Sequence, residues 1–304
     1  CCLNRQTILK FAKWLWVAAV IVAGGVYLVT HWASVSGYFA TIAVQNLLLS
    51  ALFLAAGKLV LVFLSQEAVQ GEGLNIGYAE IFRIVAISQL GKYIPGGVWH
   101  FVGRFNLYHD RELSARKSTK ALIVENVWLL SGAVISGAAA GLLSPQAPEL
   151  LERIGWRVGG WGLAALGVGL LLAWLGLLVG FERFFRKKDE AQLTWGRVLR
   201  LMGVQAAVWV LLGISFAFVF PQVSADTLLL NISVYALSWI VGYVVVFAPG
   251  GLGVREATLT WMLASVIAPE DALIYSTVHR FVYVVVELIL GALAGGMQLL
   301  NKKE

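Results

Sequence analysis

Two segments built around Pro-Gly-Gly carry most of the side chains in this sequence that can bind a ligand. Each segment interrupts an apolar stretch and has cationic residues beside the interruption. The first holds Lys92, Tyr93, Pro95, Gly96, Gly97, Trp99, His100 and Arg104, and the second holds Tyr243, Pro249, Gly250, Gly251, Gly253, Arg255 and Glu256.

These residue types favour binding of a phosphate group. A helix that begins just after a break presents unpaired backbone N–H groups and the positive end of its dipole. Paired glycines let the backbone approach a bound group closely, and proline fixes the angle at which the chain enters. The neighbouring lysine and arginines add positive charge, while the aromatic residues and histidine can donate hydrogen bonds or stack on a sugar or an amine.

Two acidic residues lie deeper in apolar segments. Glu125 is one turn into its segment, and Glu287 lies halfway along the last one, where His279, Arg280 and Tyr283 share its side at helical spacing. One interpretation is a polar stripe along a groove, in which an acid pairs with a cationic headgroup or carries a proton. The other is a structural link between Arg280 and Glu287 through a third partner.

Each charge near a break has a functional and a structural interpretation. A charge at the bilayer centre costs on the order of 3 kcal/mol, which makes Arg255 a functional candidate unless it extends to an interface. Arg104 either belongs to the site or begins a cytoplasmic loop. Glu256 is favoured in the first turn of a helix with or without a ligand. Lys58 is expected to extend its ammonium group to the membrane surface.

Composition places all of these residues in an integral membrane protein. Of 304 residues, 59% are hydrophobic and 13% are charged, and the mean hydropathy is +0.80. Soluble domains carry roughly 25% charged residues, so neither a soluble fold nor disorder fits. The net charge of +6 indicates loops facing an anionic leaflet rather than a nucleic-acid partner. Cys1 and Cys2 can form neither a disulfide framework nor a thiolate metal site.

Hydropathy predicts six full spans and two broken apolar regions. The spans are 12–33, 40–64, 121–143, 158–181, 198–220 and 272–299, and the broken regions are 79–108 and 228–267. With the N-terminus in the cytoplasm, 18 of the 23 Lys and Arg residues fall on the cytoplasmic side. We therefore expect a multi-pass protein of the cytoplasmic (inner) membrane with both termini inside.

The two broken regions predict an inverted repeat. Each precedes a span that opens with Ala-Leu-Ile, at 121–123 and at 272–274. Three spans separate the regions, so two re-entrant hairpins would enter from opposite faces. The predicted fold is an all-α polytopic domain over 1–304, with inverted repeats at 1–143 and 158–300. Chance recurrence of Pro-Gly-Gly is one alternative. In another, 228–247 and 252–267 are two ordinary spans, which gives eight spans in total.

Catalytic motifs are absent from the sequence. There is no His-Glu-x-x-His, no Gly-x-Ser-x-Gly and no Walker loop, and the four Asp residues are far apart. We therefore expect a transporter-like protein rather than an enzyme, with no cofactor and no metal.

The two break segments, Tyr93–Trp99 with Gly103-Arg104 and Pro249–Ala257, resemble the signatures of the lysylphosphatidylglycerol synthase transmembrane-region family. This is the flippase part of multiple-peptide-resistance proteins. The resemblance covers nearly the whole chain and implies a lipid-translocating bundle with re-entrant helices. Larger members continue into an aminoacyl-transferase domain; this sequence stops at Glu304 and is not expected to make the aminoacyl lipid itself. Stand-alone relatives are often linked with envelope glycan assembly, so the lipid can be an aminoacyl phospholipid, a polyprenyl-phosphate-linked sugar or another glycolipid.

Three hypotheses follow for the function. In the first, the protein moves a phosphate-containing lipid between leaflets, with one half rocking against the other. In the second, the bundle anchors or assists a separate glycosyl- or aminoacyl-transferase. In the third, it carries an ion or small solute through a closed, water-filled cavity. The oligomeric state stays open.

Overall fold

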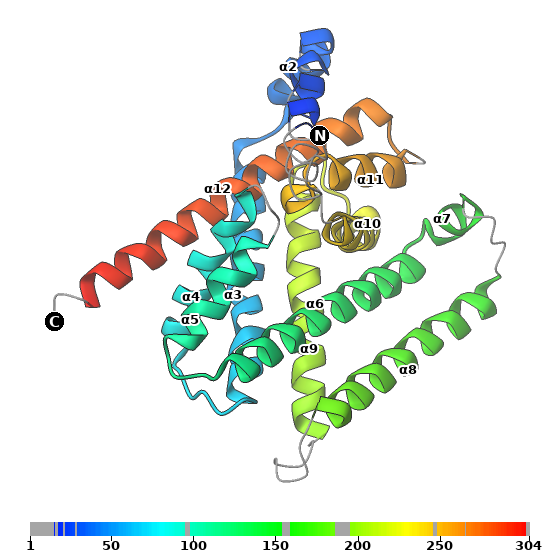
Figure 1. Ribbon diagram of the computed structural model, residues 1–304. Coiled ribbons are helices and arrows are strands. Elements are labelled where there is room, and N and C mark those ends of the chain that lie inside the picture. The colour runs from blue at the N-terminus through cyan, green and yellow to red at the C-terminus, as the bar shows by residue number, and fades with distance from the viewer. Residues whose placement is uncertain are drawn as a thin grey trace, which may run out of the picture.

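The computed structural model describes residues 15, 18–20, 22–27, 29–94, 98–153, 159–185, 195–245, 248–264 and 266–301. Every regular element in this part of the chain is a helix, so the predicted all-α class is confirmed (Figure 1). In chain order the helices are α2 (Trp32–Thr41), α3 (Val44–Gln70), α4 (Tyr78–Leu90), η1 (Gly91–Tyr93), α5 (Trp99–His109), α6 (Ala115–Leu143), α7 (Ala147–Arg153), α8 (Gly160–Phe185), α9 (Trp195–Ala217), α10 (Ala225–Val244), η2 (Pro249–Gly251), α11 (Val254–Leu263) and α12 (Pro269–Asn301).

Five of the described helices are long and apolar enough to cross a membrane, namely α3, α6, α9, α10 and α12. Four of them cover predicted spans, and α8 covers the predicted span 158–181 with an apolar segment at Trp161–Leu177. The predicted span 12–33 overlaps a bent pair of helices rather than one straight helix. The helices Ala18–Tyr27 and Trp32–Thr41 meet at 77°, next to Thr30, whose hydroxyl donates to the Val26 carbonyl and competes with the helix ladder. Counted as one bent span, this pair makes six.

The short helices surround the two breaks. Helices α4, α5 and α11 have 13, 11 and 10 residues, which correspond to about 20, 17 and 15 Å of length. None reaches across a hydrocarbon core of about 30 Å. The alternative in which 252–267 forms an ordinary span is therefore wrong, since α11 ends at Leu263. Helix α10, with 20 residues, is long enough to span by itself.

The end of α3 and the starts of α6 and α9 lie toward one end of the bundle, in the lower part of Figure 1. The Glu67 carboxylate at the end of α3 lies 2.7 Å from an Arg200 guanidinium nitrogen near the start of α9. The Glu72 carboxylate lies 2.7 Å from Lys120 Nζ in the same region. The two segments predicted to face the cytoplasm thus lie on the same side.

Helices from the first half of the chain pack against helices from the second half. Helix α4 lies against α12 and α10 lies against α6, while α3 packs along α9. The 3-10 helices η1 and η2, which adjoin the two breaks, also touch one another. Close helix contact relies on glycine: Gly137 on α6 faces Ala236 and Leu237 on α10. The result is one core of buried side chains that both halves share.

Gly213 on α9 tests how tightly this core is packed. A Cβ atom there would lie 2.5 Å from the Ile232 Cα on α10, so Gly213→Ala must push the two helices apart. We expect this change to destabilise the folded protein by about 1–3 kcal/mol. The matched control is Gly203→Ala on the same helix, where a Cβ meets nothing within 4 Å, and it should leave stability unchanged or slightly higher. Thermal unfolding in detergent measures both, and equal melting temperatures would contradict the expectation.

Candidate functional site

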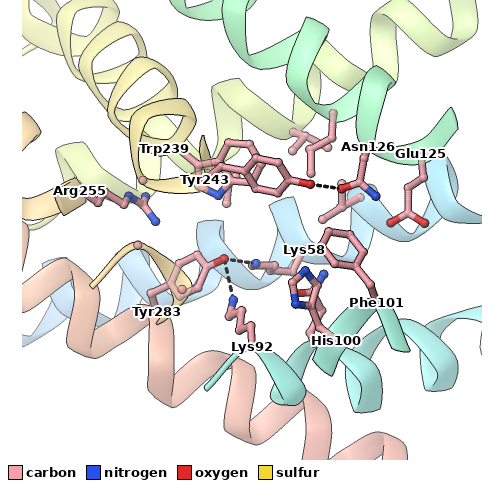
Figure 2. A pocket seen from close by; sticks show the side chains of 18 of the residues that line it. Lys58, Lys92, His100, Phe101, Glu125, Asn126, Trp239, Tyr243, Arg255 and Tyr283 are labelled. Atoms are coloured by element: carbon pink, nitrogen blue, oxygen red, sulfur yellow. Dashed lines mark hydrogen bonds between the residues drawn. The ribbon is translucent and has the colours of Figure 1, made fainter. Parts of the chain in front are cut away.

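A cavity of about 350 Å³ lies where the 3-10 helices η1 and η2 meet, and Figure 2 shows the side chains around it. Its walls come from both halves of the chain, including α3, η1, α5, α6, α9, α10, η2, α11 and α12. Charge on the lining is strongly one-sided. The basic side chains are Lys58, Lys92, Arg104, Arg255 and Arg280, and the only acid among the described lining residues is Glu125.

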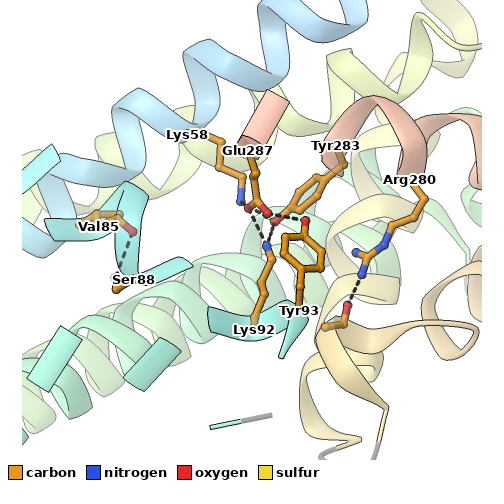
Figure 3. Close-up of polar contacts among 9 residues, drawn as sticks. Lys58, Val85, Ser88, Lys92, Tyr93, Arg280, Tyr283 and Glu287 are labelled. Atoms are coloured by element: carbon orange, nitrogen blue, oxygen red, sulfur yellow. Dashed lines mark hydrogen bonds and ion pairs between the residues drawn. The ribbon is translucent and has the colours of Figure 1, made fainter. Parts of the chain in front are cut away.

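Glu287 on α12 holds the first break in place (Figure 3). The ammonium groups of Lys58 and Lys92 each lie 2.6 Å from its Oε1 atom. The Tyr93 hydroxyl donates to the other oxygen, Oε2, at 2.6 Å. Both lysines also donate to the Tyr283 hydroxyl one turn away on α12. One buried carboxylate is therefore shared by two cations from different elements, and one positive charge remains in excess.

Arg280, also on α12, holds the second break. Its Nη2 donates to the Gly250 carbonyl oxygen at 2.7 Å, and its Nε lies 3.8 Å from the Glu256 carboxylate. The other oxygen of Glu256 accepts the Gly253 N–H at 2.7 Å and so caps α11. Gly250 and Gly251 have φ angles of 58° and 74°. Residues other than glycine disfavour this left-handed backbone conformation. The shape of this break is therefore set by its glycines.

Arg255 in the first turn of α11 has no carboxylate bound to it among the described residues. Its guanidinium lies 4.2 Å from the centre of the Tyr235 ring and 5.4 Å from that of Tyr283. The residue is only 4% exposed, yet its Nη2 has no hydrogen-bond partner in the part of the chain that the structure describes. A buried donor of this kind is costly unless a ligand or water satisfies it.

Arg104 and Glu125 form a buried ion pair on the opposite wall. One Arg104 nitrogen, Nη1, donates to Glu125 Oε1, and its Nε donates to the Ser88 hydroxyl at 3.0 Å. Both side chains are about 5% exposed or less. Arg104 therefore does not begin a solvated loop, and the charge of Glu125 is compensated within the protein.

Aromatic rings and an amide complete the lining. Trp239 and Tyr243, one turn apart on α10, stack with ring centres 4.9 Å apart. The Tyr243 hydroxyl donates to the Asn126 side-chain oxygen at 2.6 Å, and Trp209 packs edge-on against Trp239. Figure 2 shows Trp239 and Tyr243 on one side of the cavity, with Lys58 and Lys92 across from them. The cavity thus has a cationic side and an aromatic side.

The model of the lysylphosphatidylglycerol synthase transmembrane region matches residues 14–291 of the chain. The chain belongs to this family. The match includes both break segments, so the resemblance drawn from those segments is confirmed. This is a family of transmembrane regions implicated in membrane lipid handling. The multi-pass helical architecture described above is consistent with membership in it. No curated protein sequence matches the chain significantly.

Half of the predicted site residues line the cavity, and others lie beside it. Tyr93, Glu256 and Glu287 bind residues around it without being part of its lining, and Pro249 and Gly253 shape the second break. Those that line it are Lys92, His100, Arg104, Glu125, Tyr243, Gly250, Gly251, Arg255 and Arg280. Trp99 is 48% exposed and is not part of the described lining. Pro95, Gly96 and Gly97 lie outside the described residues.

Two predictions for α12 and α3 are wrong. His279 does not belong to the polar stripe, because its ring is buried against Phe216 and Tyr235 and its Nε2 lies 3.0 Å from the Ser215 hydroxyl. Lys58 does not extend to the membrane surface, because Glu287 binds its ammonium group inside the bundle. Arg280 and Glu287 have no direct contact with each other among the described contacts, but Tyr283 connects them: its ring centre lies 5.6 Å from the Arg280 guanidinium, and its hydroxyl accepts from the two lysines that bind Glu287.

Several lining residues were not predicted as site residues, among them Lys58, Asn126, Trp209 and Trp239. Lys58 carries a signal that was available, since it is a charge within an apolar span. Asn126 follows Glu125, and Trp239 precedes Tyr243 by one helical turn, but neither spacing indicates which face meets the cavity. In the described part of the chain, no cluster of His, Cys, Asp or Glu side chains is arranged to bind a metal ion.

Proposed function

We propose that the protein moves a phosphate-containing lipid between the two leaflets of the cytoplasmic membrane. The headgroup passes through the cavity, and the acyl or prenyl tails remain in the bilayer. The observation that carries this proposal is the excess of buried cations. Five basic side chains line the cavity, and the acids that line it or bind its lining residues are three: Glu125, Glu256 and Glu287.

Unbalanced positive charge in a buried site favours an anionic occupant. Desolvated cations are costly unless anions pair with them, and the low local dielectric strengthens that pairing. A phosphate group has several acceptor oxygens, which suit the free Arg255 donor and the shared Lys58 and Lys92 ammonium groups. The α11 N-terminus beside Arg255 adds the positive end of a helix dipole.

An inverted repeat is supported by the exchange of contacts between the halves. The pairing of α4 with α12 corresponds to that of α10 with α6, while α3 with α9 and η1 with η2 are pairings of equivalent elements. Tyr93 in the first half donates to Glu287 on α12, and Tyr243 in the second half donates to Asn126 on α6. Helix α3 ends, and α9 begins, at the same basic end of the bundle. We therefore propose that α4–α5 and α10–α11 enter from opposite faces and that the basic end is cytoplasmic.

Arg255→Gln tests the transport proposal. The protein is reconstituted in vesicles with a fluorescent phosphatidylglycerol, and the appearance of the label on the other leaflet is followed. We expect the variant to be at least tenfold slower, because a charged hydrogen-bond donor to the phosphate contributes about 1.5–3 kcal/mol. Folding should survive, because no carboxylate among the described residues depends on Arg255. Arg116→Gln, on the exposed basic end, is the matched control and should transport at the normal rate.

Two results would count against the proposal. Equal rates for the wild type and Arg255→Gln would remove Arg255 from the mechanism. Vesicles in which the wild type moves no labelled lipid would overturn transport and favour a subunit that anchors or assists a separate lipid-modifying transferase. Uptake of a small ion without lipid movement would favour the carrier hypothesis.

A further inference from the structure

The cavity also indicates what kind of headgroup its phosphate carries. We propose that the substrate bears an uncharged, ring-shaped polyol, such as a sugar or cyclitol, on its phosphate. This inference rests on the proposed lipid transport. The phosphate lies against the cationic side of the cavity, and the ring lies against Trp239 and Tyr243.

The first reason is that the acids at the cavity are already engaged. Glu125 is paired with Arg104. Glu287 is shared by Lys58 and Lys92. Glu256, outside the lining, caps α11. A headgroup ammonium entering this space would meet an excess of like charge, because each nearby carboxylate already binds a cation or caps a helix. A lysyl or other cationic headgroup therefore fits poorly, whereas a neutral one adds no repulsion.

The second reason is a pair of unsatisfied polar atoms among the lining residues. Glu125 Oε2 accepts no hydrogen bond and Trp209 Nε1 donates none in the part of the chain that the structure describes. Both residues are more than nine-tenths buried, being 4% and 1% exposed. One is an acceptor and the other a donor, and hydroxyl groups both donate and accept. The hydroxyl groups of a polyol can supply a donor for Glu125 Oε2 and an acceptor for Trp209 Nε1, whereas an ammonium group can only donate and an alkyl group does neither.

The third reason is the stacked aromatic pair. Trp239 and Tyr243 offer flat, partly apolar surfaces with a polar edge, which suits the apolar face of a ring that carries hydroxyls at its rim. Tyr243 is held by Asn126, so its ring orientation is fixed before a ligand arrives. In Figure 2 these rings face the side of the cavity where Lys58 and Lys92 lie, which leaves the ring and the phosphate opposite sides to contact.

The test compares three lipids with identical acyl chains in vesicles containing the protein. Phosphatidylinositol carries a neutral ring, phosphatidylglycerol a neutral open chain, and lysyl-phosphatidylglycerol a cation. We expect phosphatidylinositol to move at least tenfold faster than lysyl-phosphatidylglycerol. Trp239→Leu should slow phosphatidylinositol at least fivefold and phosphatidylglycerol less than twofold. Trp195→Leu, at an exposed position on α9, is the matched control and should slow neither.

The outcomes separate this inference from the proposed transport. If no lipid moves, the transport proposal fails. If lipids move but lysyl-phosphatidylglycerol keeps pace with phosphatidylinositol, or Trp239→Leu slows all three equally, only the ring-polyol inference fails. Labelled soluble inositol phosphate is tested as well; its uptake into the vesicles without movement of any lipid would assign the cavity to a water-soluble sugar phosphate and overturn the lipid substrate. If Trp239→Leu does not fold, Tyr243→Leu is tested in its place. It removes the other ring and should slow phosphatidylinositol more than phosphatidylglycerol.

Discussion

Replacing Arg104 with alanine is expected to destabilise the folded protein by about 3–5 kcal/mol. The change removes the cation bound to Glu125 and leaves that carboxylate buried without a counter-ion. It also removes the donor that binds the Ser88 hydroxyl and so loosens α4 from α5. Thermal unfolding of the purified protein in detergent is the measurement, and poor recovery of folded protein from membranes is expected as well.

The double variant Arg104→Met/Glu125→Leu separates the ion pair from simple packing. It removes both charges and fills similar volume, and buried ion pairs replaced in this way often lose little stability. We expect most of the lost stability to return in this variant. If it is as unstable as Arg104→Ala, the shape of the two side chains rather than their charge is what matters at this site.

Replacing Glu287 with alanine is expected to have a comparably large effect, again about 3–5 kcal/mol. Lys58 and Lys92 would then lie close together in a buried site without the carboxylate that they share, and Tyr93 would lose its acceptor. The vacated position suits another anion. Anionic phospholipid added to the detergent should therefore raise the melting temperature of the variant more than that of the wild type.

Glu80→Ala provides the matched control for Glu287. Glu80 pairs with Arg111 on the basic end, where both side chains are about one-third exposed, and such pairs contribute about 0–1 kcal/mol. We expect a small loss of stability and no added response to anionic lipid. A Glu287→Ala protein as stable as Glu80→Ala would contradict the assignment of Glu287 as the anion that holds the first break.

The sequence predicted the parts of the site that depend on local chemistry. Proline and paired glycines stop a helix wherever they occur, so the second break at Pro249–Gly251 was identified from its residues alone. An arginine in the first turn after such a break lies beside it through covalent connection, which is why Arg255 was a sound candidate. The all-helical class followed from apolar segments long enough to require internally satisfied backbone groups.

Partners that are distant in the sequence could not be predicted in the same way. Helical spacing places His279 and Tyr283 on the same side of α12, yet that side meets α9 at one level and the cavity at the next. Lys58 was assigned to the membrane surface because it lies near the predicted cytoplasmic end of its span; its acid, Glu287, is 229 positions away. Only the packing of α12 beside α3 brings the two together.

The exchanged packing of the two halves limits how the protein can open. Helix α4 packs against α12, and α10 packs against α6. Neither half can therefore rotate as a rigid body without breaking both of these helix interfaces. The short helices α5 and α11 are smaller units, and α11 follows a segment in which Gly250, Gly251 and Gly253 have positive φ angles. For the proposed passage of a headgroup, we therefore expect movement of these short helices rather than a tilt of either half as one block.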